Sequence, residues 1–306
     1  MQRVRKTSTS LASSSANAIK HAVEATKTIA WAELEEWQKD NEYILAGYRR
    51  TQNNWKGTLH SVYAYVHNET VNIHSHLWGA VLFVYLMLTF PSYVLQFPRA
   101  TWMDVAVACV FLSSAVFCLS ASAFYHAASC HSQAVSHCCH ALDYSGIVVL
   151  TVGSFYPSLY YGFYGQPHMQ AAYISGITII GLGAAYVVLN PEYSKPTHRG
   201  TRTSVFIALG LCAIVPVCHW FLTHGASTLL LDMGYGWLVA SGALYIAGAL
   251  IYANRIPERY SPGTFDYYLA SHQIFHVCVV LAALAHLAGV IKSIEYTYAA
   301  PPRNGM

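Results

Sequence analysis

Five side chains suited to metal-assisted chemistry lie in otherwise apolar stretches of this 306-residue sequence. His272 and His276 are four residues apart, so they share one helix face and are spaced to hold one metal ion. His126 follows Ser122 at the same spacing near the end of another apolar stretch, and Asp143 stands near the start of the next. Ionisable groups in lipid-phase sequence are rare and indicate function. Zinc prefers imidazole nitrogens, and three protein ligands plus a water is its usual catalytic arrangement.

The elements that must position these residues are transmembrane helices. Hydrophobic residues make up 55% of the chain and charged residues 10%, against ~25% charged residues in soluble proteins. A bilayer core of ~30 Å needs about 20 apolar residues per helix, and seven stretches qualify: 75–92, 103–125, 141–160, 170–189, 203–223, 235–253 and 270–291. Pro91, at the end of the first stretch, and Pro167, before the fourth, are expected in the chain reversals between spans, and Pro157 is expected to kink the third span. The sequence therefore predicts an all-α integral membrane protein, a seven-transmembrane helix bundle.

The chain divides into four predicted regions. They are a disordered cytosolic tail (1–27), a cytosolic or interfacial amphipathic helical segment (28–69), the bundle (70–295) and a C-terminal tail (296–306). Residues 1–23 contain no acid and have the composition of a transit peptide, which is the alternative to a plain tail. Trp31, Leu34 and Trp37 are spaced for one helical face, which indicates an interfacial helix or, equally, a segment docked under the bundle.

Basic residues predict the orientation of the bundle. With the N-terminus inside, fourteen Lys and Arg residues fall on the cytosolic side and three on the other. This asymmetry predicts a cytosolic N-terminus and an outside or lumenal C-terminus. The end of the second span and the starts of the third and seventh spans then lie at the cytosolic side. His126, Asp143, His272 and His276 are therefore expected at a similar depth.

Five ordered motifs resemble the progestin and adipoQ receptor family over residues 31–295. They are WQKDNEYILAGYR (37–49), HNETVNIHSHLWG (67–79), SAFYH (122–126), LDYSG (142–146) and SHQIFHV (271–277). The upstream motif is similar to the adiponectin-receptor and haemolysin III-like branch. Fungal members of the Izh type are linked to zinc homeostasis and to sterol or lipid metabolism, and the chain resembles these as well.

The resemblance implies roles for the five residues. The family shares a site of Ser, three His and Asp with alkaline ceramidases. His126, His272 and His276 match its zinc ligands, Asp143 matches the carboxylate that holds the zinc-bound water, and Ser122 matches the serine beside the metal. Zinc lowers the pKa of bound water to ~7. The expected reaction is hydrolysis of a ceramide-type lipid amide, with Asp143 taking the water proton and Ser122 steadying the oxyanion.

Three classes of function stay open at this point. They are a receptor-like protein with zinc amidohydrolase activity, a non-enzymatic receptor with structural zinc, and a zinc transporter or sensor. The expected partners are a membrane lipid, ceramide-like or a fatty acid, and an extracellular or lumenal ligand that the sequence does not name. The expected location is the plasma membrane or the endoplasmic reticulum. Nucleic acid is not expected, because the sequence has no basic stripe with interleaved aromatics.

Other polar residues receive structural interpretations. The polar side chains of Glu69, Asn72 and His76 are predicted to satisfy the start of the first helix and the neighbouring loops. A predicted loop after the second span is either solvated or a second metal site; it carries His131, His137, His140, Cys138 and Cys139. The eight cysteines lie mostly within apolar runs or at their ends, so they are predicted to be packing thiols rather than a disulfide framework. His74, His219 and His286 are predicted to be hydrogen-bonded bundle residues or pore-lining groups.

Overall fold

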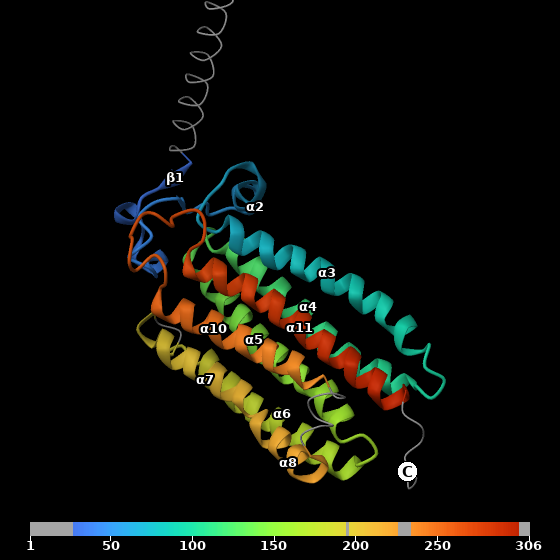
Figure 1. The fold of residues 1–306 in the computed structure, drawn as a ribbon. Helices are drawn as coiled ribbons and strands as arrows, with labels where there is room; N and C mark the ends of the chain where they lie inside the picture. Colours follow the sequence, from blue (N-terminus) through green and yellow to red (C-terminus); the bar gives the residue numbers. More distant parts are fainter. Residues whose placement is uncertain (1–26, 194–195, 226–233, 300–306) are drawn as a thin grey trace, which may run out of the picture.

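The computed structural model describes residues 27–193, 196–225 and 234–299, and the predicted N-terminal tail lies almost wholly outside them. Within the described residues, seven helical spans are long and apolar enough to cross a membrane. They lie side by side in a single bundle (Figure 1). The predicted seven-transmembrane helix bundle is confirmed.

The spans are α3 (Thr70–Val94), α4 (Trp102–Ala128), α5 (Gln133–Gly162), α6 (Pro167–Leu189), α7 with α8 (Arg199–Leu211 and Ile214–His224), α10 (Tyr235–Asn254) and α11 (Ser271–Ala299). Shorter elements are β1 (Thr28–Ile29), η1 (Trp31–Glu33), η2 (Glu36–Gln38), β2 (Tyr48–Arg49), α2 (Trp55–Ala64) and η3 (Pro196–His198).

Each of the seven predicted spans is shorter than the helical span observed, and three further features differ from the structure. The fifth span is broken between α7 and α8, one turn before Pro216, whose ring clashes with the carbonyl four residues earlier in a continuous helix. The prediction that Pro91 lies in a chain reversal is wrong, because α3 continues through it to Val94. The predicted loop after α4 is also too long, since α5 already begins at Gln133 and contains His137 and His140.

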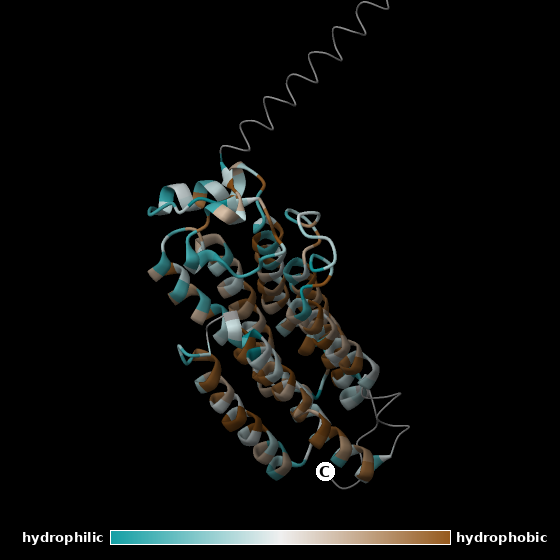
Figure 2. Cartoon of the chain, turned by 90° about the vertical axis from the view of Figure 1, so that its left-hand side faces the viewer, coloured by the Kyte–Doolittle hydropathy of each residue, from teal (hydrophilic) through white to brown (hydrophobic). Residues whose placement is uncertain are grey.

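Helix α4 lies at the centre of the bundle, where it packs against α3 and α5. Of its apolar window 61% is buried, the largest share among the seven spans described. Phe111, Leu112 and Leu119 on α4 are fully buried. In contrast, Leu88 and Leu222 on outer helices are 71% and 80% exposed. Apolar side chains on the outside suit contact with lipid. Figure 2 shows apolar residues along the helices and hydrophilic residues at the end of the bundle where the segment before α3 lies.

Two glycines allow α4 and α5 to approach closely. A Cβ atom at Gly146 would lie 2.9 Å from the Cα atom of Cys118, and one at Gly153 would lie 2.3 Å from the Ser114 hydroxyl. Any larger residue would push the helices apart. Gly146 stands one turn after Asp143, so the close approach brings this carboxylate to the face of α4.

The segment before the bundle does not form the predicted amphipathic helix. Residues 28–49 contain an antiparallel pair, β1 with β2, and two 3₁₀ turns, η1 and η2. Leu34 is buried, whereas Trp31 and Trp37 are half-buried. The structure therefore shows no α-helix over residues 28–49, and this segment packs against the end of the bundle. Tertiary contacts override the helical spacing of the apolar residues here. A few apolar side chains are enough to anchor the segment, and they do so without forming a helix.

This segment is held by the connection between α10 and α11. Asp40 forms an ion pair with Arg255, and the Asn41 amide donates to the Glu258 carboxylate at 3.0 Å. The Leu45 amide donates to the Asp266 carboxylate at 2.8 Å. The pre-bundle segment and the start of α11 therefore form one packed unit.

Candidate metal centre

The start of α11 is defined by a buried carboxylate. Glu258 is fully buried and accepts hydrogen bonds from the Ser271 backbone N–H, at 2.8 Å, and from the Ser271 hydroxyl. Such a cap satisfies N–H groups that the first turn leaves without partners. It places His272 and His276 in the first two turns of α11, next to the last turn of α4, which carries His126.

The three histidines form a nearly equilateral triangle. Their ring centroids lie 4.9 Å (His126–His272), 4.7 Å (His126–His276) and 4.8 Å (His272–His276) apart. One nitrogen from each ring lies within 4.8 Å of the other two. His126 and His276 are each only 2% exposed. The structure thus brings together all three residues that the sequence predicted as metal ligands.

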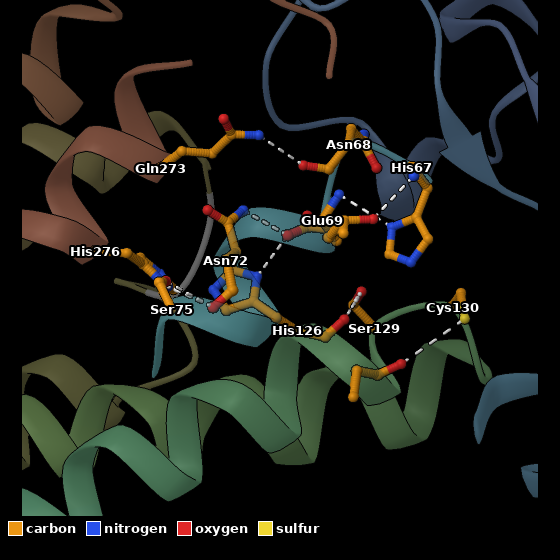
Figure 3. A network of polar contacts seen from close by, with 12 residues as sticks. His67, Asn68, Glu69, Asn72, Ser75, His126, Ser129, Cys130, Gln273 and His276 are labelled. Atoms are coloured by element: carbon orange, nitrogen blue, oxygen red, sulfur yellow. Dashed lines mark hydrogen bonds and ion pairs between the residues drawn. The ribbon is translucent and has the colours of Figure 1, made fainter. Parts of the chain in front are cut away.

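Hydrogen bonds determine which nitrogens face one another. The Nδ1 atom of His126 lies 2.7 Å from a Glu69 carboxylate oxygen, and the Nδ1 atom of His276 lies 3.1 Å from the Asn72 carbonyl oxygen (Figure 3). Since both oxygens act as acceptors, each Nδ1 carries the proton and each Nε2 keeps a lone pair. The Nε2 atom of His126 is buried without a hydrogen-bond partner. Buried imidazole lone pairs that converge in this way fit a zinc ion.

Asp143 and Ser122 line the same cavity as the histidines. This cavity has a volume of about 420 Å³, within the range of small-molecule sites. Ser122 is 3% and Asp143 8% exposed, and the Ser122 hydroxyl interacts with the Asp143 carboxylate. The structure therefore gathers all five sequence-predicted site residues around one cavity.

The cavity also has a charged rim formed by the pre-bundle segment and the helix ends. Asp40, Arg202 and Arg255 line it there. Burial raises the pKa of Asp40, but the neighbouring Arg255 guanidinium outweighs this and holds that pKa below its usual value. The rim therefore carries a charged pair at neutral pH.

Comparison with known proteins now identifies the family. The family model "Haemolysin-III related" matches residues 64–287, which include all three histidines. The chain belongs to this family, which includes the progestin and adipoQ receptors. It is 38% identical over 86% of its length to progestin and adipoQ receptor-like protein 1 of Caenorhabditis elegans. It is 36% identical over 88% of its length to the adiponectin receptor protein of Drosophila melanogaster. The chain spans 60% of the length of each of these relatives.

A yeast relative matches over more of its own length. The ADIPOR-like receptor IZH2 of Saccharomyces cerevisiae is 35% identical, and the match covers 88% of this chain and 84% of the yeast protein. The sequence-based assignment to the progestin and adipoQ receptor family is confirmed. Seven apolar spans together with these membrane receptor relatives make the chain a multi-pass integral membrane protein.

The family motif at the start of α3 contributes to the site more directly than the sequence indicated. Glu69 and Asn72 were interpreted as residues that satisfy the helix start. Instead, they contact two of the three histidines. Arg49, at the end of the upstream family motif, also reaches the last turn of α4. The feature of the sequence that could have indicated this role is an acidic residue, Glu69, at the boundary of a long apolar run.

In the described part of the chain, no histidine or cysteine outside the triangle joins the group that could hold a metal. Among the residues that the structure describes, His126, His272 and His276 are the one group of three arranged to hold a metal, so the second cluster near His137 is not supported. His219 hydrogen-bonds to Tyr173 at 2.8 Å, as expected of a bundle residue. All eight cysteines are free; three are buried and three half-buried, whereas Cys138 and Cys218 are exposed and so do not fit the predicted packing role.

Proposed function

We propose that this adiponectin-receptor-like protein is a zinc-dependent hydrolase of ceramide-type lipid amides, acting in lipid signalling and in zinc and lipid homeostasis. The observation that carries the proposal is the triangle of histidines on a cavity that Ser122 and Asp143 also line. Among the described residues, no carboxylate or thiol joins the histidines within the same mutual distance. This supports a fourth position open to water, as in catalytic zinc sites, rather than a closed structural site.

The chain supplies a base and a hydrogen-bond donor. Zinc in such a site polarises a carbonyl and lowers the pKa of water to about 7. Asp143 is the group that orients the attacking water and accepts its proton. Ser122 donates a hydrogen bond to the amide oxygen as negative charge develops on it. Both residues are held in place by the close packing of α4 and α5 at Gly146.

The cavity lining supports a lipid amide as the substrate class. Ile147, Phe275 and Val279 line the cavity together with the polar residues. A ceramide-type lipid combines a polar amide with apolar chains and so matches both kinds of surface. The product classes are a sphingoid base and a fatty acid.

The reaction is tested with purified, zinc-loaded protein and ceramides of several acyl lengths. The expected result is release of sphingoid base by the wild type and by Ser145→Ala, whose hydroxyl is exposed and bonds only within α5. Asp143→Asn is expected to release the base at least ~100-fold more slowly. Equal release by wild type and Asp143→Asn would contradict the hydrolase. X-ray absorption showing four protein ligands would instead favour a receptor with structural zinc.

The proposed orientation has a cytosolic N-terminus and a metal centre at the cytosolic face, in the plasma membrane or the endoplasmic reticulum. The asymmetry of fourteen basic residues against three supports it. Cys138 is exposed near the start of α5, at the same end as the metal centre. In a variant that keeps only this cysteine, a membrane-impermeant maleimide should label it from the cytosolic side alone. Labelling from the opposite side would contradict the orientation.

A further inference from the structure

Helix α3 supplies none of the three histidines, yet its first turn contacts two of them. We propose that Glu69 and Asn72 are positioning residues that set the metal affinity of the site. Glu69 orients the ring of His126, whereas Asn72 holds both the Glu69 carboxylate and the ring of His276. This inference rests on the zinc site proposed above and assigns the control of its affinity to a third helix.

The contact between Glu69 and His126 is directional. The carboxylate oxygen Oε2 accepts the Nδ1–H of His126 at 2.7 Å (Figure 3). An ionised carboxylate only accepts hydrogen bonds, so it selects the tautomer in which Nε2 is free to bind a metal. It also makes the imidazole a more basic ligand. The buried Nε2 atom of His126, without a hydrogen-bond partner, is the atom presented to the cation.

Asn72 links the two histidines through its side chain and its backbone. Its amide nitrogen donates to the same Oε2 atom of Glu69 at 2.6 Å. Its carbonyl oxygen accepts the Nδ1–H of His276 at 3.1 Å. Asn72 therefore holds the carboxylate that bonds to His126, and it accepts the hydrogen bond of His276 itself.

A second residue of α3 restrains the His276 ring from its face. His76 stacks on His276 with ring centroids 3.7 Å apart and an interplanar angle of 12°. Its Nε2 atom lies 3.2 Å from the His276 carbonyl oxygen. The ring of His276 is thus held at its edge by Asn72 and at its face by His76, so little rotation remains.

A purely structural role at the helix start fits Glu69 poorly. A side chain with a structural role at this position accepts a hydrogen bond from the free N–H groups of the first turn. Although Glu69 occupies the N-cap position of α3, its side chain makes no capping hydrogen bond. The carboxylate points instead to His126 and Asn72. A negative charge there also offsets the charge of a divalent cation held by three neutral ligands.

The experiment measures zinc affinity by chelator competition, and it records the visible spectrum of the Co²⁺-substituted protein, which reports ligand geometry. Glu69→Ala is expected to bind zinc 10–100-fold more weakly and to change the Co²⁺ spectrum. Glu69→Gln keeps an acceptor oxygen without the charge, so it should fall between wild type and Glu69→Ala. His74→Ala is the matched control, because the His74 ring bonds to the Thr70 carbonyl of its own helix.

A double variant tests whether Asn72 influences zinc affinity through Glu69. If the Asn72 side chain acts through Glu69, Asn72→Ala should weaken zinc binding, and Glu69→Ala/Asn72→Ala should be no weaker than Glu69→Ala alone. Wild-type affinity and an unchanged Co²⁺ spectrum in both Glu69 variants would overturn the positioning role while leaving the zinc site standing. Wild-type protein that binds no zinc would overturn the zinc site and this inference together.

Discussion

The guanidinium of Arg49 donates hydrogen bonds to the backbone carbonyl of His126 at the last turn of α4. It also donates to the Ala127 carbonyl at 2.9 Å and to the Ser129 hydroxyl at 3.0 Å. The last carbonyls of a helix have no partners within it, and a cation there also interacts favourably with the helix dipole. Arg49 is only 3% exposed. The segment before the bundle therefore supports one of the metal-site histidines directly.

Replacement of Arg49 should destabilise this end of the bundle. Arg49→Met leaves buried carbonyls unsatisfied, and we expect a loss of about 3 kcal/mol. Arg50→Met is the control, because Arg50 is exposed and forms only a long ion pair with Glu33 at 3.9 Å. Thermal unfolding of the purified proteins in detergent measures the difference. Equal melting temperatures for the two variants would show that the Arg49 contacts do not stabilise α4.

Metal removal should lower stability through the histidine triangle alone. A ligand that binds only the folded state stabilises it by about 4 kcal/mol at a thousandfold excess over its Kd. A chelator should therefore lower the melting temperature of the wild type and leave that of His276→Ala unchanged. His286→Ala, a buried change further along α11, should still respond to the chelator. A chelator effect that persists in His276→Ala would place the metal elsewhere.

The sequence was sufficient to predict the seven spans and the five residues around the cavity. Span length follows from the thickness of the bilayer, and the pair His272 and His276 follows from helix periodicity. His126 and Asp143 could be placed level with that pair because the topology alternates from span to span. These features depend on the composition of each span and on the direction in which it crosses the membrane. Both can be read directly from the sequence.

The contacts of the polar segments could not be predicted in the same way. The roles of Arg49 and Glu69 depend on how the pre-bundle segment and the first turn of α3 dock against the end of α4. In the sequence both residues stand in the charged region before the first span, where charged residues are usually solvated. The amphipathic helix was predicted from the spacing of Trp31, Leu34 and Trp37, but strand pairing and docking replaced it. Tertiary contacts of short segments leave no periodic signal.

Acidification should weaken the start of α3 through His67. This side chain is fully buried, and its Nδ1 atom accepts the Glu69 backbone N–H at 3.1 Å. Burial, with a contribution from Arg49, lowers the pKa of His67 to about 3. Because the folded pKa lies below the unfolded value of about 6.5, the stabilisation is complete above pH 6.5 and is lost progressively as the pH falls toward 3.

The variant His67→Asn isolates this effect, since asparagine keeps an acceptor oxygen and does not titrate. Between pH 7.5 and 5.5 the wild type should lose about 1.4 kcal/mol more stability than the variant. Melting temperatures at the two pH values, recorded side by side, provide the measurement. If both proteins lose stability in parallel, His67 does not contribute to the pH dependence.

The opposite end of the bundle depends on a buried carboxylate near the start of α4. Asp104 on α4 is fully buried. It accepts hydrogen bonds from the hydroxyls of Tyr161, at 3.1 Å, and Tyr298, and from the Thr101 backbone N–H at 2.8 Å. Asp104 therefore joins α4 to α5 and α11.

Asp104→Ala should cost about 3 kcal/mol, because it leaves several buried donors without an acceptor. Tyr161→Phe removes a single bond and should cost about 1 kcal/mol. Zinc affinity should remain unchanged in both variants, since 22 residues of helix separate Asp104 from His126, a rise of about 33 Å. Melting temperature and metal content are measured on the same samples. Loss of zinc from a stably folded Asp104→Ala protein would show that the two ends of the bundle are coupled, contrary to this prediction.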